Sequence, residues 1–520
     1  MTDILHSYIG GRWVAPDDDG RPLSDAATGE EVARISDEAL DYAAVLDHAR
    51  AVGGPALREL TFRQRAAILK SLGKHLSARI PEFTEVSFHT GATRRDSAVD
   101  IDGGIGALFV YGSKGARELP DDTILRDGEF ESLGKSGAFG VQHITTPLLG
   151  ANVQINAFNF PVWGMLEKFA PAFLAGVPSI VKPASQTAYL TEKVVRDIVA
   201  SGLVPEGALQ LVCARPDGLL DLLTGQDLLS VTGSHTTATA LRRHPVVASN
   251  AVRFTAEADS LNSSILGADV RRDSPEFDIF VRGLVTEMTQ KTGQKCTAIR
   301  RAFVPRALLD DVEAAVAERL SKLTVGDPRD ESVRVGPLVG QGQRDDVRDA
   351  ARSLARAGRT VFGTIDTAPE NFSAAADFVN GAYMSPVLLR FDDATAQEPH
   401  SIEAFGPVSS LLPYDGLDEA LQLVARGEGS LAASIVTADP DIARKAVIAA
   451  APWHGRLLVL DADNAGESTG HGAAVPHAVH GGPGRAGGGE ELAGLRTLGH
   501  FMQRTAVQGG PAFLDTLGVA

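Results

Sequence analysis

The sequence contains very little cysteine and no long hydrophobic run. Cys213 and Cys296 are the two cysteines among 520 residues, too few for a disulfide framework, which favours a reducing, cytoplasmic compartment. The amino terminus has no basic stretch followed by an apolar core, so no signal peptide is expected. No apolar run approaches the ~20 residues that a membrane helix needs. These absences exclude a disulfide-stabilised secreted scaffold and a membrane-spanning protein.

Positive charge is scarce relative to negative charge. The chain has 49 lysines and arginines against 66 acidic residues, a formal net charge of -17. Such a chain repels phosphate backbones and anionic membrane surfaces, so neither nucleic acid nor membrane is expected as a partner. The length exceeds what one small core can organise and predicts roughly two or three packed domains.

Strand and helix patterns alternate from about residue 150 onward. Strands are expected at residues 153–158, 178–181, 209–213 and 228–231, and helices at 163–174, 191–201 and 219–223. A second series of alternating elements is expected after these, with a helix at 276–291, a strand at 302–304 and a helix at 307–323. This alternation predicts an α/β fold with parallel sheets that place ligands at strand carboxyl ends. The glycine-rich residues 471–491 are expected to form a long loop.

Cys296 is the first candidate for chemistry. It lies in the stretch GQKCT, residues 293–297, where glycine and polar neighbours favour an accessible thiol. A thiolate is a strong nucleophile. The alternative is a buried, inert cysteine, which is how we interpret Cys213 because its neighbours alternate like a core strand.

Two polar residues could assist a nucleophile. The carboxylate of Glu257 could activate a water molecule, although an isolated glutamate is usually a solvated surface residue. The amide of Asn159, in the stretch AFNFP at residues 157–161, could donate to a developing oxyanion. Asparagine at a strand-to-helix junction also commonly caps a helix or forms a turn.

The dinucleotide fingerprint G-x-G-x-x-G does not follow any expected strand. Lys182 follows a strand and could contact a ribose or phosphate, or be an ordinary surface lysine. Gly233 and Ser234 open a helix whose amides could bind a pyrophosphate. The glycine run at residues 481–489 lacks the Lys-Ser/Thr of a P-loop, so close backbone packing is the better interpretation.

Three histidines in the glycine-rich region could suggest a metal ion. His471, His477 and His480 have apolar neighbours and no accompanying cysteine or carboxylate set. We therefore expect structural histidines and no metal site.

Taken in order, these segments resemble the aldehyde dehydrogenase superfamily over nearly the whole chain. The matching segments are residues 158–161 (FNFP), 182–184 (KPA), 232–234 (TGS), Glu257, 293–296 (GQKC) and 403–408 (EAFGPV). The resemblance implies an enzyme with a Rossmann-like cofactor domain, an α/β catalytic domain and a small oligomerisation region. The expected division is 1–258 for the cofactor domain, 118–147 for oligomerisation, 259–460 for the catalytic domain, and 461–520 for a return to the cofactor domain and a tail.

The resemblance also implies a role for each catalytic residue. Cys296 would attack the aldehyde and carry first a thiohemiacetal and then a thioester. Asn159 would hold the oxyanion, and Glu257 would activate the hydrolytic water. Lys168 and Glu491 would form a proton relay that serves Glu257.

The implied cofactor is a nicotinamide dinucleotide. Its ribose and ring contacts would come from Glu403, Phe405 and Phe158, its adenosine contacts from Lys182, and its pyrophosphate contacts from Gly233 and Ser234. NAD-preferring relatives usually carry an acid where this chain has Ser185. A small neutral residue leaves room for a 2′-phosphate and favours NADP, with NAD as the alternative. Glu257 is also followed by Ala-Asp-Ser where relatives usually have Leu-Gly-Gly.

Within the superfamily, residues 99–106, 257–262, 293–301 and 480–495 are similar to the dehydrogenase part of bifunctional ring-opening enzymes of phenylacetate degradation. That resemblance implies oxidation of 3-oxo-5,6-dehydrosuberyl-CoA semialdehyde, with the hydratase as a separate protein. The alternatives are 3,4-dehydroadipyl-CoA semialdehyde from benzoyl-CoA breakdown, a CoA-acylating dehydrogenase, and a non-enzymatic binding protein. A homodimer or a dimer of dimers is expected, with the tail adding a strand to a neighbour.

Overall fold

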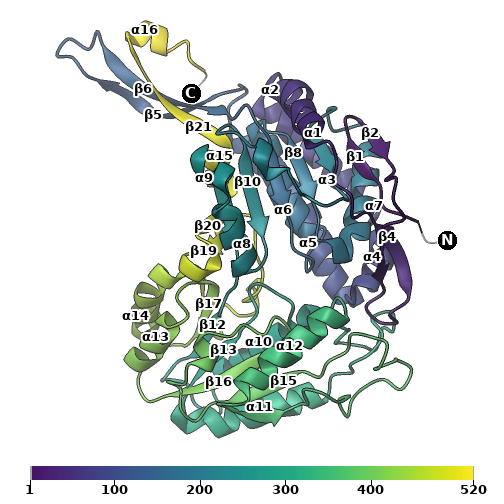
Figure 1. Ribbon diagram of the computed structural model, residues 1–520. Helices are drawn as coiled ribbons and strands as arrows, with labels where there is room; N and C mark the ends of the chain where they lie inside the picture. Colours follow the sequence, from purple (N-terminus) through teal and green to yellow (C-terminus); the bar gives the residue numbers. More distant parts are fainter. Residues whose placement is uncertain (1–2, 519–520) are drawn as a thin grey trace.

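Two seven-stranded sheets form the centres of two lobes in the computed structural model, which describes residues 3–518 apart from the side chains of Glu491 and Leu492 (Figure 1). One sheet takes its strands from residues 7–257 and the other from residues 263–460. The predicted α/β fold is therefore confirmed. The predicted domain boundaries stay predictions.

The first sheet has the order β11-β10-β7-β8-β9-β1-β2. Its strands are Arg253–Glu257, Leu228–Thr232, Asn152–Ile155, Ser179–Lys182, Leu209–Leu211, Ser7–Ile9 and Arg12–Val14. The five strands from β11 to β9 are parallel, whereas β1 and β2 form an antiparallel hairpin at the amino terminus. The helices of this lobe are α1 (Tyr42–His48), α2 (Gly54–Arg58), α3 (Phe62–Ser77), α4 (Ile80–Ser87), α5 (Arg94–Glu118), α6 (Trp163–Ala175), α7 (Ala188–Ala200), α8 (His235–Arg242) and α9 (Pro245–Ser249).

The second sheet has the order β14-β15-β16-β13-β12-β17-β18. Its strands are Arg359–Phe362, Val387–Arg390, Val408–Tyr414, Arg301–Pro305, Ser263–Leu266, Ser430–Val436 and His454–Leu460, and its helices are α10 (Pro275–Thr289), α11 (Leu309–Ser321), α12 (Gln341–Leu354), α13 (Leu417–Ala425) and α14 (Pro440–Ala450). Neighbouring strand residues point to opposite faces. Ile265 therefore packs with α12 and α13, whereas Leu266 packs with α10 and α11. Both faces are covered, as a parallel sheet requires.

A three-stranded antiparallel sheet extends from the first lobe (Figure 1). It consists of β5 (Leu125–Ser132), β6 (Gly140–Pro147) and β21 (Met502–Gly509), with α15 (Leu498–Phe501) before and α16 (Pro511–Leu514) after β21. β21 pairs with β6 of the same chain along eight register positions. The carboxyl-terminal tail and residues 118–147 thus share one structural unit.

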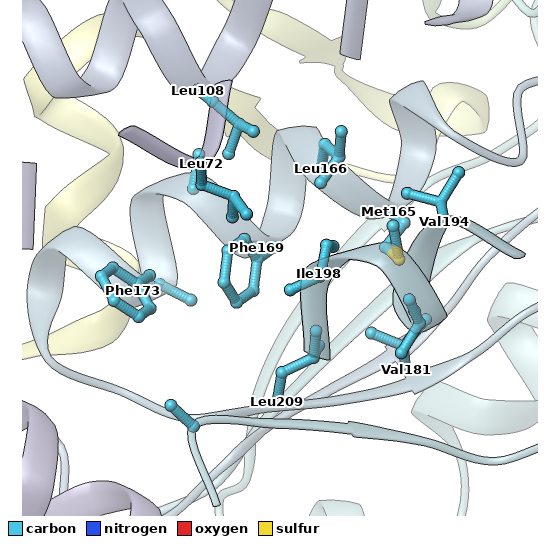
Figure 2. Packing of buried hydrophobic residues seen from close by; sticks show 14 of the residues in the cluster. Leu72, Leu108, Met165, Leu166, Phe169, Phe173, Val181, Val194, Ile198 and Leu209 are labelled. Carbon is cyan, nitrogen blue, oxygen red and sulfur yellow. The ribbon is translucent and has the colours of Figure 1, made fainter. Parts of the chain in front are cut away.

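Helix α6 is buried on nearly every side, and this packing holds the preceding loop in place. Figure 2 shows Leu166, Phe169 and Phe173 of α6 close to Leu72 and Leu108 of α3 and α5. A helix that is hydrophobic all round belongs in a core, and the residues from Met165 to Ala175 are all buried. The loop that carries Asn159 therefore enters a rigid helix.

Three predictions of local structure were wrong in part. The strand predicted at 153–158 ends at Ile155, and the helix predicted at 219–223 is a single 3₁₀ turn at Leu220–Leu222. The loop predicted at 471–491 contains the hairpin strands β19 (His480–Gly482) and β20 (Gly489–Leu492). β20 lies beside β11, where a Cβ on Gly487 would stand 2.3 Å from the Ala256 carbonyl oxygen. These glycines allow close backbone packing, which no hydrophobic periodicity records.

Among the described residues, no helix is both long and apolar enough to span a bilayer.

Candidate active site

Cys296 follows a strained turn between α10 and β13. Lys291, Thr292 and Gly293 have φ values of 54°, 53° and 66°, a left-handed conformation that a β-branched threonine rarely adopts. Two contacts hold the turn: the Lys291 amide donates to Asp96 of α5 over 2.8 Å, and the Thr292 hydroxyl donates to the Gly336 carbonyl over 2.9 Å. The tertiary structure therefore stabilises the backbone that presents the thiol.

Two buried side chains bind the backbone around the thiol. Asn262 Nδ2 donates to the carbonyls of Cys296 and Ala298 over 2.7 and 3.0 Å. Arg300 donates to the Gly293 carbonyl over 2.9 Å and to the Gly406 carbonyl over 2.7 Å. Arg300 thereby links the cysteine loop to the segment that carries Glu403.

Asn159 is placed by the start of α6. Asp100 of α5, which is fully buried, accepts hydrogen bonds from the amides of Val162 (3.2 Å) and Trp163 (2.8 Å). Burial raises the pKa of Asp100 to about 6. Asn159 Nδ2 donates to the Gln294 carbonyl over 3.1 Å, which leaves its second N–H for another acceptor. The amide is thus held against the loop that carries Cys296.

Glu257 stands at the carboxyl end of β11 and is paired with a histidine. Its Oε2 lies 2.7 Å from His480 Nε2, and both side chains are at most 5% exposed. Burial raises the pKa of Glu257, but the charge and hydrogen bond of His480 lower that pKa by more, so that it lies below its usual value. Burial lowers the pKa of His480, but Glu257 raises it more. The geometry thus favours a buried carboxylate–imidazolium pair.

The thiol is itself half-buried. Burial and then the negative charge of Glu257 raise the pKa of Cys296 well above its usual value. Lys295 next to it is bound to Glu287 (2.9 Å) and Gln290 (2.7 Å). The resting sulfur therefore carries its proton.

Two cavities meet at these residues. One has a volume of about 590 Å³ and the other about 40 Å³. Both linings contain Asn159, Glu257 and Cys296. The larger volume lies in the range of ligand-binding clefts, and the smaller holds little more than a water molecule. A thiol at the junction can react with a group that enters from either side.

The larger cavity also contains most of the residues predicted to bind a cofactor. Its lining includes Phe158, Gly233, Ser234, Glu403 and Phe405. The rings of Phe158 and Phe405 are 5.9 Å apart in an edge-on arrangement. Glu403 Oε2 accepts from the Ser260 amide over 3.0 Å. Its Oε1 accepts no hydrogen bond within the described part of the chain but lies 3.7 Å from Arg300 Nε, and burial raises the pKa of Glu403 to about 7.

Four predicted residues stand outside this arrangement or on its border. Lys182 and Ser185 are not among the residues that line either cavity, and Lys182 Nζ donates to the adjacent Pro183 carbonyl over 2.7 Å. Lys168 pairs with Glu167 over 3.2 Å and acts electrostatically on Glu257. The side chain of Glu491 lies outside the described residues.

Sequence reasoning assigned no chemical part to His480, Asn262 or Arg300. His480 is separated from Glu257 by more than two hundred positions, so no spacing rule pairs them. Asn262 and Arg300 lie in the segments 257–262 and 293–301, which carry the family resemblance, but only the folded backbone shows which carbonyls they bind.

The comparisons with known proteins agree with this geometry. A family model described as "Aldehyde dehydrogenase family" matches residues 13–457. The 3,4-dehydroadipyl-CoA semialdehyde dehydrogenase of Aromatoleum evansii is 41% identical over 481 residues, which cover 92% of this chain and 93% of that protein.

Solved structures show the same fold at lower identity. Betaine aldehyde dehydrogenase from Staphylococcus aureus in complex with NAD⁺ matches with a TM-score of 0.84 and 20% identity, over 97% of this chain and 94% of that one. 3,6-Anhydro-L-galactose dehydrogenase in complex with NADP matches with a TM-score of 0.83 and 22% identity, over 98% and 100%.

Proposed function

The chain belongs to the aldehyde dehydrogenase family and is an oxidoreductase that acts on aldehydes, and on that premise we propose that it oxidises a CoA-linked semialdehyde to the acid with NADP. The main support for this proposal is that Cys296, Asn159 and Glu257 lie together where the two cavities meet. The larger cavity would hold the dinucleotide and the smaller one the aldehyde end of the substrate.

The first half-reaction uses Cys296 as the nucleophile. The thiol gives its proton to a water molecule, the sulfur forms a bond to the aldehyde carbon, and the electron pair of the carbonyl π bond moves to the oxygen, which gains negative charge. The free N–H of Asn159 Nδ2 would donate to that oxygen. Because Asn159 is already fixed to the Gln294 carbonyl, it needs little reorganisation when the charge develops.

The residues of the larger cavity fit a nicotinamide dinucleotide. Glu403 Oε1, which accepts no hydrogen bond within the described residues and lies 3.7 Å from Arg300 Nε, suits a ribose hydroxyl donor, and the amides at the start of α8 suit a pyrophosphate. Arg485 adds a positive charge to this lining, although its Nη2 also lies 3.8 Å from Asp259. The bound nicotinamide would supply the hydride acceptor, after which Cys296 carries a thioester.

The second half-reaction uses Glu257 as the general base. Its carboxylate would take a proton from water, and the resulting hydroxide would displace the cysteine thiolate from the thioester. His480 is a positioning residue for this base because it binds Oε2. Lys168, whose charge acts on Glu257, and Glu491 would complete the predicted relay. The CoA-acylating alternative is less well supported because Glu257 lines both cavities at the thiol.

We propose 3,4-dehydroadipyl-CoA semialdehyde as the first substrate candidate, because the relative of that name is 41% identical over most of both chains. The narrow cavity, with Trp163, Gly164 and Gly472 in its wall, suits an unbranched aldehyde end. The second candidate is 3-oxo-5,6-dehydrosuberyl-CoA semialdehyde, which the motif resemblance at residues 257–262 and 480–495 favours. A separate hydratase protein would then supply it.

Absorbance of reduced nicotinamide would test this assignment with each CoA semialdehyde, generated in place, and with simple aliphatic aldehydes. We expect kcat/KM for a CoA semialdehyde to exceed that for hexanal by at least about a hundredfold, because the remote CoA part contributes binding energy to the transition state. Comparable turnover of hexanal would discard the CoA-linked substrate. A requirement for free CoA would replace hydrolysis by acyl transfer.

Ser185→Glu should shift the cofactor preference from NADP toward NAD. Ser185 is half-buried three residues after the end of β8, at the start of a 3₁₀ turn, and a carboxylate there would repel a 2′-phosphate. A like-charge contact near a protein surface costs a few kcal/mol, so the ratio of kcat/KM values should change by about tenfold or more. Ser185→Gln is the uncharged control. An unchanged ratio in the glutamate variant would remove Ser185 from cofactor selection.

We further propose that the chain works as a cytoplasmic homodimer or dimer of dimers. β5 and β21 are the edge strands of the extended sheet, and an edge strand can pair with a neighbouring chain. In the described residues β21 already pairs with its own β6, so a neighbour would add to its second edge.

A further inference from the structure

We propose that Cys296, Glu257 and His480 also form a binding site for a thiophilic divalent cation such as Zn²⁺, which would block the nucleophile reversibly. The inference goes beyond the proposed oxidation and concerns the resting enzyme. The proposal rests on the convergence of a thiol, a carboxylate and an imidazole. Their donor atoms all lie within 4.8 Å of one another.

The three donors match the ligands that zinc takes in proteins. Zinc binds cysteine sulfur, histidine nitrogen and carboxylate oxygen at about 2.0 to 2.3 Å, in a tetrahedron whose donors are therefore about 3.3 to 3.8 Å apart. The present separations run from 2.7 Å, for His480 Nε2 to Glu257 Oε2, up to 4.8 Å. Shifts of about an ångström or less would bring all three into range.

A second observation points to a ligand at the same place. Glu257 is 2% exposed, its buried Oε1 has no nitrogen or oxygen hydrogen-bond donor among the described residues, and the Cys296 thiol is within hydrogen-bonding reach of the carboxylate. The cavity of about 40 Å³ is lined by Glu257, Cys296 and His480 together. That volume accommodates one small ion or water, and the cavity side would offer a fourth coordination position to a water molecule.

The local charges suit a dication. Binding would replace the thiol proton of Cys296 and the proton between His480 and Glu257, so the ion would meet one thiolate, one carboxylate and one neutral imidazole. Of the nearby cations, Lys168 is offset by Glu167 at 3.2 Å and Lys295 by Glu287 at 2.9 Å, and the buried Arg456 guanidinium also acts electrostatically on Cys296, Glu257 and His480. The ion therefore gains two compensating negative charges in a site that excludes most water.

The consequence for catalysis follows from the sulfur. A thiolate whose lone pair is bound to zinc is held away from the aldehyde carbon, and a carboxylate bound to zinc is a weaker base for water. Stoichiometric Zn²⁺ should therefore stop turnover, and a chelator should restore it without a thiol reductant.

Co²⁺ titration of the full-length protein, in an oxygen-free buffer with a non-thiol reductant, tests the site directly. We expect a thiolate-to-cobalt charge-transfer band that saturates at one equivalent and disappears when Zn²⁺ is added. In Cys296→Ser the band should be absent. In His480→Gln and Glu257→Gln the dissociation constant should rise by more than about tenfold, since even outer-shell partners of metal ligands are worth that much. Cys213→Ser, which removes the fully buried cysteine, should behave like the wild type.

Three results would overturn the site. The first is no charge-transfer band in the wild type at one equivalent. The second is a band that survives in Cys296→Ser. The third is unchanged affinity in both His480→Gln and Glu257→Gln, which would mean a simple adduct of one thiolate. Far-ultraviolet circular dichroism and thermal unfolding of each variant establish that it is folded.

Metal binding and aldehyde oxidation are measured separately, so failure of the metal site can be distinguished from failure of the proposed function. A protein that binds Co²⁺ at one equivalent but oxidises no CoA semialdehyde would keep the metal site and lose the substrate assignment. A protein that oxidises the semialdehyde at full rate with several equivalents of Zn²⁺ present would keep the oxidation and lose the metal site.

Discussion

Replacement of Cys296 by serine is expected to lower aldehyde oxidation by about four orders of magnitude while the dinucleotide still binds. A serine hydroxyl is a far weaker nucleophile than a thiolate, and removal of a covalent nucleophile leaves only residual catalysis from binding. The loop should keep its geometry, because Asn262 binds the main-chain carbonyl of residue 296 and not its side chain.

Two measurements check this expectation. Steady-state absorbance of reduced nicotinamide gives the turnover, and fluorescence quenching or calorimetry gives the affinity for NADP. Cys213→Ser is the matched control, since that thiol is buried in the first lobe and should leave turnover unchanged. If Cys296→Ser kept more than about a hundredth of wild-type activity, covalent catalysis by this residue would be rejected.

Glu257→Gln should retain the first turnover and slow the following ones by roughly a hundredfold to ten-thousandfold, the range of general-base assistance. Glutamine keeps the size of the side chain but cannot accept a proton from water. Loss of the negative charge should also make the Cys296 thiolate easier to form, because that charge raises the pKa of the thiol. Acylation is therefore expected to survive.

Rapid mixing with the aldehyde and NADP would show this as a burst of reduced nicotinamide equal to the enzyme concentration. Mass spectrometry of the quenched variant should find the acyl group on Cys296. Glu192→Gln serves as the control, because Glu192 is a largely buried carboxylate paired with Arg196 outside both cavities. Steady-state turnover at the wild-type rate in Glu257→Gln would show that another group activates the water.

Cys213 and Cys296 show how much of the burial of a cysteine could be predicted from its neighbours in the sequence. Alternation of apolar residues predicted a core position for Cys213, and the structure has it fully buried just after the end of β9. Glycine and polar neighbours predicted accessibility for Cys296, which is half-buried at the junction of two cavities. Local pattern sufficed for Cys213, whereas the thiol of Cys296 is reached through the cavities although its polar neighbours Gln294, Lys295 and Thr297 are themselves buried.

The glycine-rich segment shows where local pattern fails. Glycines at 481–489 were interpreted as a loop, whereas two short strands form there and lie along β11. The pairing depends on a backbone that approaches Ala256 too closely for any side chain. A residue without a side chain carries no periodic signal, so the glycine run predicted close backbone packing but not the strands that form there or the strand that they approach.

The sequence by itself determined the α/β alternation, the order of motifs, the family, and the identity of Cys296, Asn159 and Glu257 as candidates, since these depend on residue type and neighbouring positions. Only the tertiary structure decided that His480 binds Glu257, that Asp96 and Asp100 of α5 anchor the loops of Cys296 and Asn159, and that Lys182 turns away to its own neighbour. Apart from the contact of Lys182 with Pro183, those contacts join residues that are far apart in the chain. Their energies depend on burial and on distances of a few ångströms, which exist only once the lobes are packed.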